Sequence, residues 1–360
     1  MKPVRIGIDA RELLGDTTGV GRYLGELLLR WTARPDAASR QFLLYTPEPL
    51  TLSFATALPR VLGGSRGTLW EQTTLAAAVA RDKPDVFFAP AYTAPLRLAP
   101  PLAVTIHDAS FSRHPEWFSF RERTRRRVLT RSAARRAKIV LTVSNFSARE
   151  IQELYGVPAS RIEVVHNGVS PRPAPMSTAR EPLVLYTGSI FNRRRLPDLI
   201  AAFSRVLQAV PEGRLVIVGA NRTFPYQDLA AVAQKLGVTA RVDIRDYVPE
   251  SELAALYGKA SAFAFLSEYE GFGITPLEAL AAGLPVIALD TAVAREIYGD
   301  AAVLVRPGDV AGTAQELTRL LTAPQSAAAH LARAPAVLAR YSWDDAAEAT
   351  LAAIERAARR

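Results

Sequence analysis

The 360-residue sequence contains no cysteine. A disulfide framework and thiol chemistry are therefore excluded, which fits the reducing cytoplasm. No stretch approaches the ~20 consecutive apolar residues that a membrane-spanning helix needs. The opening residues, MKPVRIGIDA, lead directly into a strand pattern without the apolar region of a secretory leader. We therefore expect a cytoplasmic protein that does not cross a membrane.

Positive charge, by contrast, is abundant. The chain has 44 Lys and Arg against 35 Asp and Glu, a net charge of +9 (44 minus 35), and a sequence pI near 10.0. Such a balance favours anionic partners, among them nucleotide diphosphates, anionic lipid surfaces and nucleic acid. A hydrophobic content of 49% and a charged content of 22% are typical of a globular protein. The length exceeds that of a single core and predicts two domains.

Short apolar runs with strand character alternate with helical patterns throughout the chain. In the first half they lie at residues 4–9, 41–45, 85–90, 102–106, 139–143 and 162–165. In the second half they lie at residues 183–188, 214–219, 262–266, 285–289 and 302–305. Strands that alternate with helices predict doubly wound parallel sheets. The expected fold class is α/β, with two Rossmann-like domains.

A segment without apolar periodicity separates the two halves. Residues 170–181, SPRPAPMSTARE, are rich in Pro and Ser, as is typical of a linker. We place an N-terminal domain at residues 1–170, the linker at 171–181 and a C-terminal domain at 182–342. A final helix is predicted over residues 343–360.

The most informative stretch of the sequence runs from Ala262 to Asp290. Its first strand is followed by a polar, glycine-bearing loop at residues 267–273 and then by a short helix. Thr275 has the place of the helix N-cap and Pro276 that of the first helical residue, while Gly283 stops the helix before the next strand. Such a loop presents free backbone N–H groups and the positive end of a helix dipole to an anion.

Two carboxylates, Glu270 and Glu278, bracket this loop with seven residues between them. Taken alone, Glu278 would complete a capping box worth ~1 kcal/mol, and Glu270 would be a solvated loop acid. The whole string with both flanking strands closely resembles the signature of the retaining glycosyltransferases of family 4. These enzymes have the GT-B architecture, in which two Rossmann-like domains face each other across a cleft and the last helix crosses back to the first domain.

The resemblance implies roles for several residues of the C-terminal domain. Glu270 would be a catalytic residue beside the donor sugar, and Glu278 would bind the ribose hydroxyls of a nucleotide sugar. Between them, backbone N–H groups would meet the sugar hydroxyls and the diphosphate. These groups belong to Phe272, Gly273, Ile274 and Thr275. The segment Tyr247-Val248 resembles the family's base-binding loop, which holds the nucleobase mostly through backbone groups.

A basic loop follows the first strand of the C-terminal domain and contains Arg193, Arg194 and Arg195. In the resembled family a Lys in this loop neutralises the donor diphosphate, and Arg194 falls at that position. A guanidinium binds phosphate bidentately, so the chemistry survives the exchange. Which arginine makes the contact stays open between Arg193, Arg194 and Arg195. The helix dipole disfavours arginines at a helix start, which indicates an anionic ligand.

Gly19 and Gly21 lie between the first strand and a helix, where a phosphate can bind at the helix N-terminus. Leu24 stands where the dinucleotide fingerprint has its third glycine, and the preceding loop is too long for that tight turn. An oxidoreductase is therefore disfavoured. The glycines form either a plain helix-entry loop or, as the resemblance implies, a close approach of the backbone to the donor diphosphate.

His107 and Asp108 follow the strand at residues 102–106. The carboxyl ends of parallel strands line the ligand crevice of such a sheet, although a single His there is more often structural. The string from Val104 to Phe111 resembles the family's donor-sugar histidine motif, and on that resemblance we assign His107 a catalytic role. Asp108 would either orient His107 or cap the following turn.

The most basic stretch runs from Arg121 to Lys138 and has nine Lys or Arg and one Glu, hence +8 by subtraction. It is expected to be mostly helical. One interpretation is a solvated helix face. The other is a surface that binds anionic lipid or a lipid-diphosphate acceptor at the inner face of the membrane, each charge contributing ~1 kcal/mol. Nucleic acid is disfavoured because no aromatic residues interleave the arginines.

No Asp-x-Asp occurs in the sequence, so the metal-chelating pair of the other large glycosyltransferase fold is missing. We predict transfer that needs no metal and no cofactor, with a nucleotide sugar as donor and a glycan or lipid-linked glycan as acceptor. The resemblance implies retention of the anomeric configuration. Gly19 to Tyr23, Trp70 to Gln72 and His107 to Pro115 resemble the mannosyltransferase-like branch, so GDP-mannose is the first candidate donor. UDP-glucose, UDP-GlcNAc and a deoxysugar donor remain open.

Two other functions were weighed against transfer. A non-catalytic sugar-nucleotide scaffold would have lost His107, Glu270 or the loop cations, and all are present. A GT-B sugar-nucleotide epimerase would share the fold but gives no reason for the paired glutamates.

Overall fold

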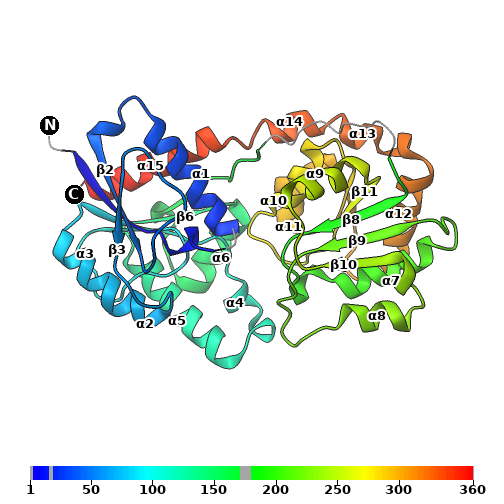
Figure 1. The fold of residues 1–360 in the computed structure, drawn as a ribbon, viewed down its shortest axis with the longest axis horizontal. Helices are drawn as coiled ribbons and strands as arrows, with labels where there is room; N and C mark the ends of the chain where they lie inside the picture. The colour runs from blue at the N-terminus through cyan, green and yellow to red at the C-terminus, as the bar shows by residue number, and fades with distance from the viewer. Residues whose placement is uncertain (1–2, 16–18, 171–179, 360) are drawn as a thin grey trace. The chain divides into compact units, whose positions relative to one another are not determined.

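The computed structural model describes residues 3–15, 19–170 and 180–359. The chain divides into two compact units. The first comprises residues up to 113, residues 120–168 and residues 342–360, and the second comprises residues 114–119 and 169–341. Each unit is built on one parallel sheet with helices packed against it (Figure 1). Most of the predicted linker, residues 171–179, lies outside the described residues.

The sheet of the first unit has seven parallel strands in the order β3-β2-β1-β4-β5-β6-β7. The strands are β1 (Val4–Asp9), β2 (Arg40–Thr46), β3 (Ala57–Val61), β4 (Val86–Ala89), β5 (Leu102–Thr105), β6 (Ile139–Thr142) and β7 (Ile162–Val164). The central strands β4 and β5 are buried at every position, because helices cover both faces of a parallel sheet. This explains why they appear in the sequence as continuous apolar runs.

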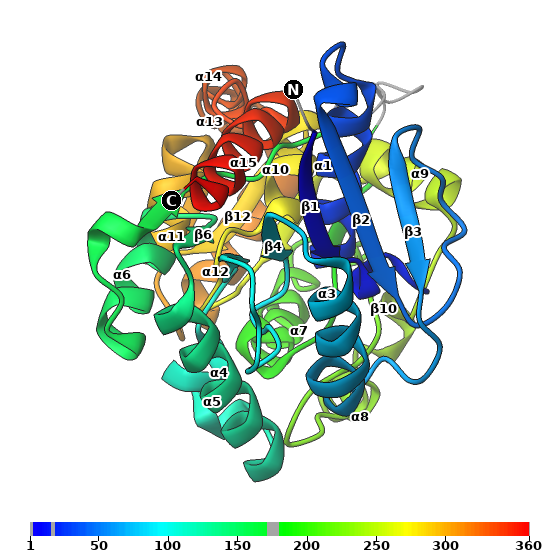
Figure 2. The same cartoon turned by 90° about the vertical axis from the view of Figure 1, so that its left-hand side faces the viewer.

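The helices of the first unit follow the predicted pattern. They are α1 (Gly19–Ala33), α2 (Thr68–Trp70), α3 (Ala76–Asp82), α4 (Ser110–Arg113), α5 (Phe120–Arg136), α6 (Asn145–Tyr155) and α15 (Trp343–Ala358). A π-helical turn, η3 (Glu71–Leu75), joins α2 to α3. The last helix, α15, packs beside α1 and against β4, β5 and β6 (Figure 2). The buried Trp31 indole of α1 donates to the Ala347 carbonyl at 2.8 Å and joins these two helices.

The sheet of the second unit has six parallel strands in the order β10-β9-β8-β11-β12-β13. The strands are β8 (Leu183–Thr187), β9 (Arg214–Val218), β10 (Val242–Arg245), β11 (Ala262–Phe265), β12 (Val286–Leu289) and β13 (Ala302–Val305). The helices are α7 (Leu196–Val206), α8 (Leu229–Lys235), α9 (Glu250–Lys259), α10 (Ile274–Ala281), α11 (Ala292–Ile297), α12 (Val310–Thr322), α13 (Ala328–Leu331) and α14 (Ala334–Leu338).

The predicted fold class, two doubly wound parallel sheets, is confirmed. Sequence reasoning missed two edge strands, β3 and β10, neither of which has a buried residue. Strand β3 also contains Pro59. Proline lacks the N–H that a central strand needs and is tolerated at a sheet edge, which is where β3 lies. Among the described helices, none has both the length and the apolar character needed to cross a membrane.

Candidate active site

In the second unit, two loops that leave the carboxyl ends of β8 and β11 are joined to each other. The first contains η6 (Asn192–Arg194), and the second is the predicted glycine loop. The backbone N–H of Glu268 donates to the Arg193 carbonyl at 2.9 Å. The basic loop and the Glu270 loop therefore form one surface at the sheet edge where open α/β folds bind ligands.

The predicted carboxylate and two of the predicted arginines meet on this surface. Oε1 of Glu270 lies 2.7 Å from Nη1 of Arg194 and 3.6 Å from Nε of Arg193. The Ser267 hydroxyl donates to the same oxygen at 2.5 Å. The three charged side chains are only 10–12% exposed. The negative charge of Glu270 is thus held in place by two guanidinium groups and one hydroxyl.

The third arginine points elsewhere. Nη2 of Arg195 pairs with Asp198 at 2.6 Å, and its side chain is 40% exposed. Arg195 has a left-handed backbone conformation, with φ of 52°, which places it at the start of α7 and turns its side chain along that helix. Of the three candidates left open by the sequence, Arg193 and Arg194 are therefore the two that contact Glu270.

Arg194 is held by an aromatic ring as well as by Glu270. Its guanidinium carbon lies 4.4 Å from the centre of the Phe265 ring. In the part of the chain that the structure describes, its Nε is buried and no atom accepts a hydrogen bond from it. Buried donors are nearly always satisfied, so this nitrogen has capacity for an acceptor that the described residues do not supply.

The helix after the glycine loop begins earlier than predicted. Gly273, not Thr275, is the N-cap of α10, and its backbone is left-handed with φ of 81°. The prediction that Thr275 caps the helix and Pro276 begins it is therefore wrong. The reason is that glycine reaches this conformation without steric cost and lets the chain turn two residues sooner. Ile274 and Thr275 form the first turn and are half-buried, as is Gly273.

A buried tyrosine fixes this turn. The Tyr298 hydroxyl lies 3.1 Å from the Gly273 carbonyl and 3.3 Å from the Phe272 carbonyl, to which it donates. Burial raises the pKa of Tyr298 well above its ordinary value, so the hydroxyl keeps its proton. A Cβ on Gly273 would lie 2.0 Å from that hydroxyl. Tyr298 therefore occupies the space that the missing side chain leaves open.

The remaining predicted residues of this unit differ in exposure. Glu278 lies on α10, one turn beyond Ile274, and is buried. Tyr247 follows β10 and is 79% exposed, whereas the neighbouring Val248 is buried. The β10 and β9 ends are joined because the Gly219 N–H donates to the Arg245 carbonyl at 2.7 Å.

In the first unit, His107 lies just beyond the carboxyl end of β5. Its Nε2 is 2.9 Å from the Pro90 carbonyl, and since a carbonyl can only accept, Nε2 carries the proton. Burial lowers the pKa of His107 below its ordinary value, so the imidazole is neutral at pH 7. Its ring contacts those of Tyr23 and Tyr92, with centroids 4.9 and 5.6 Å away.

Of the two roles predicted for Asp108, the structure shows the capping of the following turn. Its Oδ1 accepts the Ser110 N–H at 2.8 Å and thereby caps α4, and its Oδ2 accepts the Tyr92 hydroxyl at 3.1 Å. Gly19 is exposed at the start of α1, and Gly21 is buried two residues further along the same helix. Since Tyr23 of the same helix contacts His107, the glycine segment and His107 belong to one region of the first unit.

Several residues of these sites were not singled out from the sequence. They are Tyr23, Tyr92, Ser267 and Tyr298. Each is a hydroxyl-bearing residue. The three tyrosines have partners that are distant in the chain, whereas Ser267 contacts the Glu270 side chain three residues further along. A single sequence gives no signal for such pairs, because composition and periodicity indicate burial but not which groups meet.

Comparison with known families supports the same assignment over nearly the whole chain. Residues 17–172 match the family described as Glycosyltransferase Family 4, and residues 172–335 match Glycosyl transferases group 1. The chain belongs to glycosyltransferase family 4. It is accordingly a transferase enzyme, and its two Rossmann-like units have the GT-B architecture.

Relatives of this family 4 chain include O-antigen chain mannosyltransferase B of Escherichia coli, 27% identical over 75% of the chain and 74% of that protein. A D-inositol 3-phosphate glycosyltransferase of Mycobacterium avium is 34% identical over 59% of the chain but 53% of the relative. Among solved structures, sucrose-phosphate synthase from Thermosynechococcus elongatus has a TM-score of 0.77 at 19% identity, covering 99% of the chain and 98% of the neighbour. Anabaena Alr3699/HepE in complex with UDP and glucose has a TM-score of 0.75 at 21% identity, covering 98% of the chain and all of the neighbour.

Proposed function

We propose that this glycosyltransferase moves a hexose from a nucleoside-diphosphate sugar to a glycan or lipid-linked acceptor, with retention and without a metal ion. The observation that carries the proposal is Arg194. A buried guanidinium that has an unused N–H lies beside Glu270. It is on the same sheet edge as the N-terminus of α10, whose first backbone N–H groups have no partner within the helix.

A diphosphate matches this combination of groups. Arg193 and Arg194 supply two positive charges, and Gly273 to Thr275 supply half-buried N–H groups at a positive helix end. Charge on the departing diphosphate would be stabilised by groups that are already in place, which is the arrangement that lowers a transition-state barrier. Glu278 would hold the ribose, and Tyr247 with Val248 the base.

We assign the positioning of the sugar to two groups, Glu270 and His107. Glu270 is paired with two arginines, so it serves as electrostatic support and positioner of the sugar and not as a nucleophile. His107 donates through Nε2 to Pro90, which leaves Nδ1 of the neutral ring as an acceptor for a sugar hydroxyl. The acceptor would attack from the face that the diphosphate leaves, and a phosphate oxygen would take its proton.

The donor we favour is GDP-mannose. Two relatives carry the name O-antigen chain mannosyltransferase, and a third, from Komagataeibacter xylinus, is a GDP-mannose:cellobiosyl-diphosphopolyprenol alpha-mannosyltransferase. The structural neighbours described as complexes contain UDP or UDP-glucose, which keeps UDP-glucose and UDP-GlcNAc as alternatives. A deoxysugar donor is the remaining option.

A thermal-shift panel tests the donor. We expect GDP and GDP-mannose to raise the Tm, because a ligand at 100 times its Kd stabilises the fold by about 2.7 kcal/mol. EDTA should leave that rise unchanged, because the proposed site binds the diphosphate without a metal ion. A rise with uridine nucleotides instead would show that the donor is a UDP-sugar and would leave the transferase assignment unchanged. No rise with any nucleotide would contradict the proposed donor site.

The basic helix α5 gives the protein a surface for anionic lipid. Arg121, Arg127 and Arg131 are exposed along it, and so are Phe120 and Val128. Exposed apolar groups among cations suit the boundary of an anionic bilayer. We place a peripheral contact with the inner face of the membrane here.

Vesicle binding tests this contact. Exchange of Arg121, Arg127 and Arg131 for Gln should weaken binding to phosphatidylcholine–phosphatidylglycerol vesicles by about 3 kcal/mol, roughly 100-fold, since each charge contributes ~1 kcal/mol. The matched control exchanges three exposed arginines of the second unit, Arg205, Arg214 and Arg241. Equal losses in the two triple variants would mean that net charge, not α5, drives binding.

A further inference from the structure

A strained turn lies next to His107. Tyr92 has φ of 64°, and the Thr93 N–H donates to the Ala91 carbonyl at 2.7 Å, which makes Tyr92 the centre of a γ-turn with positive φ. This is the rare and strained form of that turn. Two other non-glycine residues in the described chain have positive φ, Lys83 and Arg195, and both lie at helix ends. Tyr92 lies in a loop, where such a conformation persists only when the surrounding structure holds it.

The turn brings Tyr92 against His107. The two ring centroids are 5.6 Å apart, and the Tyr92 ring also meets that of Phe111 at 5.8 Å. The Tyr92 hydroxyl donates to Asp108, the residue after His107. Tyr23 contacts the imidazole from α1. Two aromatic rings and the Pro90 carbonyl thus fix the orientation of the imidazole.

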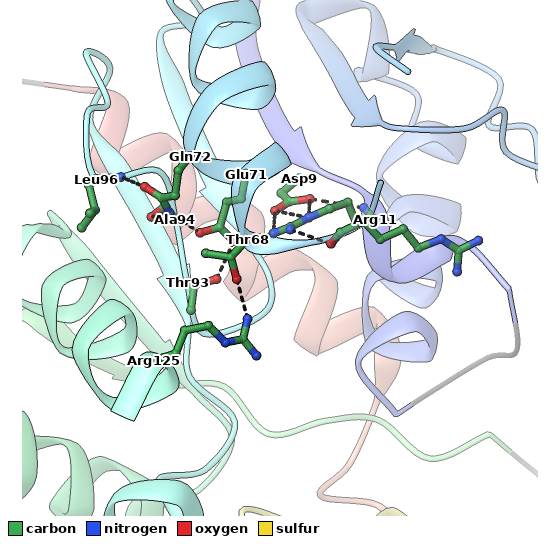
Figure 3. Close-up of polar contacts among 10 residues, drawn as sticks. Asp9, Arg11, Thr68, Glu71, Gln72, Thr93, Ala94, Leu96 and Arg125 are labelled. Carbon is green, nitrogen blue, oxygen red and sulfur yellow. Dashed lines mark hydrogen bonds and ion pairs between the residues drawn. The ribbon is translucent and has the colours of Figure 1, made fainter. Parts of the chain in front are cut away.

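The turn is anchored on both sides. The Tyr92 N–H donates to the Thr105 carbonyl of β5 at 2.9 Å. On the other side, the Thr93 hydroxyl donates to Oε2 of Glu71 at 2.6 Å (Figure 3). Glu71 is 2% exposed and begins the π-helical turn η3. Single π turns within α-helices occur frequently at functional sites.

Glu71 is held in turn by a buried ion-pair cluster. Nη2 of Arg11 lies 2.5 Å from Oε2 of Glu71 and 2.6 Å from Oδ2 of Asp9, the last residue of β1 (Figure 3). Burial alone would lower the pKa of Arg11, but the two carboxylates raise it above its ordinary value. Gln72 donates to the other oxygen of Glu71 at 2.6 Å and accepts the Leu96 N–H at 2.8 Å.

This cluster takes three charged side chains out of water. Two buried carboxylates share one guanidinium, a net charge of −1 (two negative, one positive), and buried charges repay their lost hydration only with excellent geometry. The cluster fixes the segments that leave the carboxyl ends of β1 and β4, the edge at which His107 lies. A cluster with a purely structural role would not need a strained turn that packs against a histidine.

We propose that Tyr92 is a positioning residue for His107, and that the cluster of Asp9, Arg11 and Glu71 holds its strained turn through Thr93. The role in catalysis rests on the proposed function of His107. The Tyr92 ring keeps the imidazole in place and excludes water from it, while the hydroxyl fixes Asp108.

The test compares Tyr92→Gly with Lys83→Gly. Both substitutions relieve the strain of a positive φ, so both variants should fold. Only Tyr92→Gly removes a ring that contacts His107. We expect Tyr92→Gly to lower kcat about 10- to 100-fold while the KM for the donor changes less than about twofold, as for a small displacement of a catalytic group. Tyr92→Phe keeps the ring and should stay within about threefold of wild type. Lys83→Gly should leave both parameters unchanged.

A second readout does not depend on turnover. The imidazole resonances of the four histidines can be titrated by NMR, with His107→Gln used for assignment. Among the described residues, the titratable groups that face His107 are Tyr23, Tyr92 and Asp108. Tyr92→Gly should raise the pKa of His107 toward its ordinary value, because burial is the main cause of its depression. Thr93→Val, which removes the link to Glu71, should shift it in the same direction.

The outcomes separate the two proposals. Unchanged kcat and unchanged His107 titration in Tyr92→Gly, as in Lys83→Gly, would overturn the positioning role. A wild-type protein that neither binds nucleotides nor releases nucleoside diphosphate from GDP-mannose or UDP-glucose would overturn the proposed function instead. In that case the NMR shift still decides whether Tyr92 positions His107.

Discussion

Arg194→Ala should abolish the nucleotide-induced rise in Tm and lower kcat/KM about 100- to 1,000-fold, the range found when one preorganised charge donor of a transition state is removed. The physical reason is that the guanidinium is buried between Glu270 and the Phe265 ring, so no water can replace it at low cost. The same change also leaves Glu270 with a weaker set of partners. The measurements are a thermal-shift titration and steady-state kinetics on the same preparations.

Arg195→Ala is the matched control for this prediction. The residue is next in the chain and has the same charge, but its side chain is 40% exposed and pairs with Asp198. Exposed pairs contribute little, so the variant should bind nucleotide as the wild type does. Arg194→Lys should recover part of the activity, since the charge returns without the bidentate geometry. Full nucleotide binding by Arg194→Ala would refute the assignment and leave Arg193 as the phosphate ligand.

Gly273→Ala should lower the free energy of unfolding by about 2–5 kcal/mol and disturb donor binding. An L-residue with positive φ costs roughly 1–2 kcal/mol, and the new Cβ would lie 2.0 Å from the Tyr298 hydroxyl, an overlap that costs about 1–3 kcal/mol to relieve. Because Gly273 is the N-cap of α10, the displacement would also move the N–H groups proposed to bind the diphosphate. Chemical denaturation and the thermal-shift panel measure the two effects.

Two further variants separate strain from overlap. Gly237→Ala places a methyl at a similar φ of 69° with no heavy atom within 4 Å, so it should show only the strain of roughly 1–2 kcal/mol. Adding Tyr298→Phe to Gly273→Ala removes the clashing oxygen and should restore part of the lost stability. Strictly additive effects of these two changes would show that Tyr298 and Gly273 are not coupled in the way the structure indicates.

The sequence by itself determined the fold class and much of the element order. Strands at residues 4–9 and 302–305 were predicted with the observed bounds, because buried parallel strands are continuous apolar runs. In the sequence, the two glutamates and the glycine loop form one motif. The family was assigned on that motif, and the comparison with known families confirmed it. The roles of the individual site residues remain predictions.

Tertiary structure decided what depends on contacts between distant residues. It determined that Arg193 and Arg194, and not Arg195, face Glu270. It placed the start of α10 at Ile274, because a glycine turn supported by Tyr298 overrides the local capping pattern. The strain at Tyr92 has no local signal at all, since residues 71 and 105 hold that turn from outside its own segment. The local sequence pattern indicates which residues are buried and with what periodicity. The partner of a buried polar group is determined only by the folded structure, because the partner comes from a distant part of the chain.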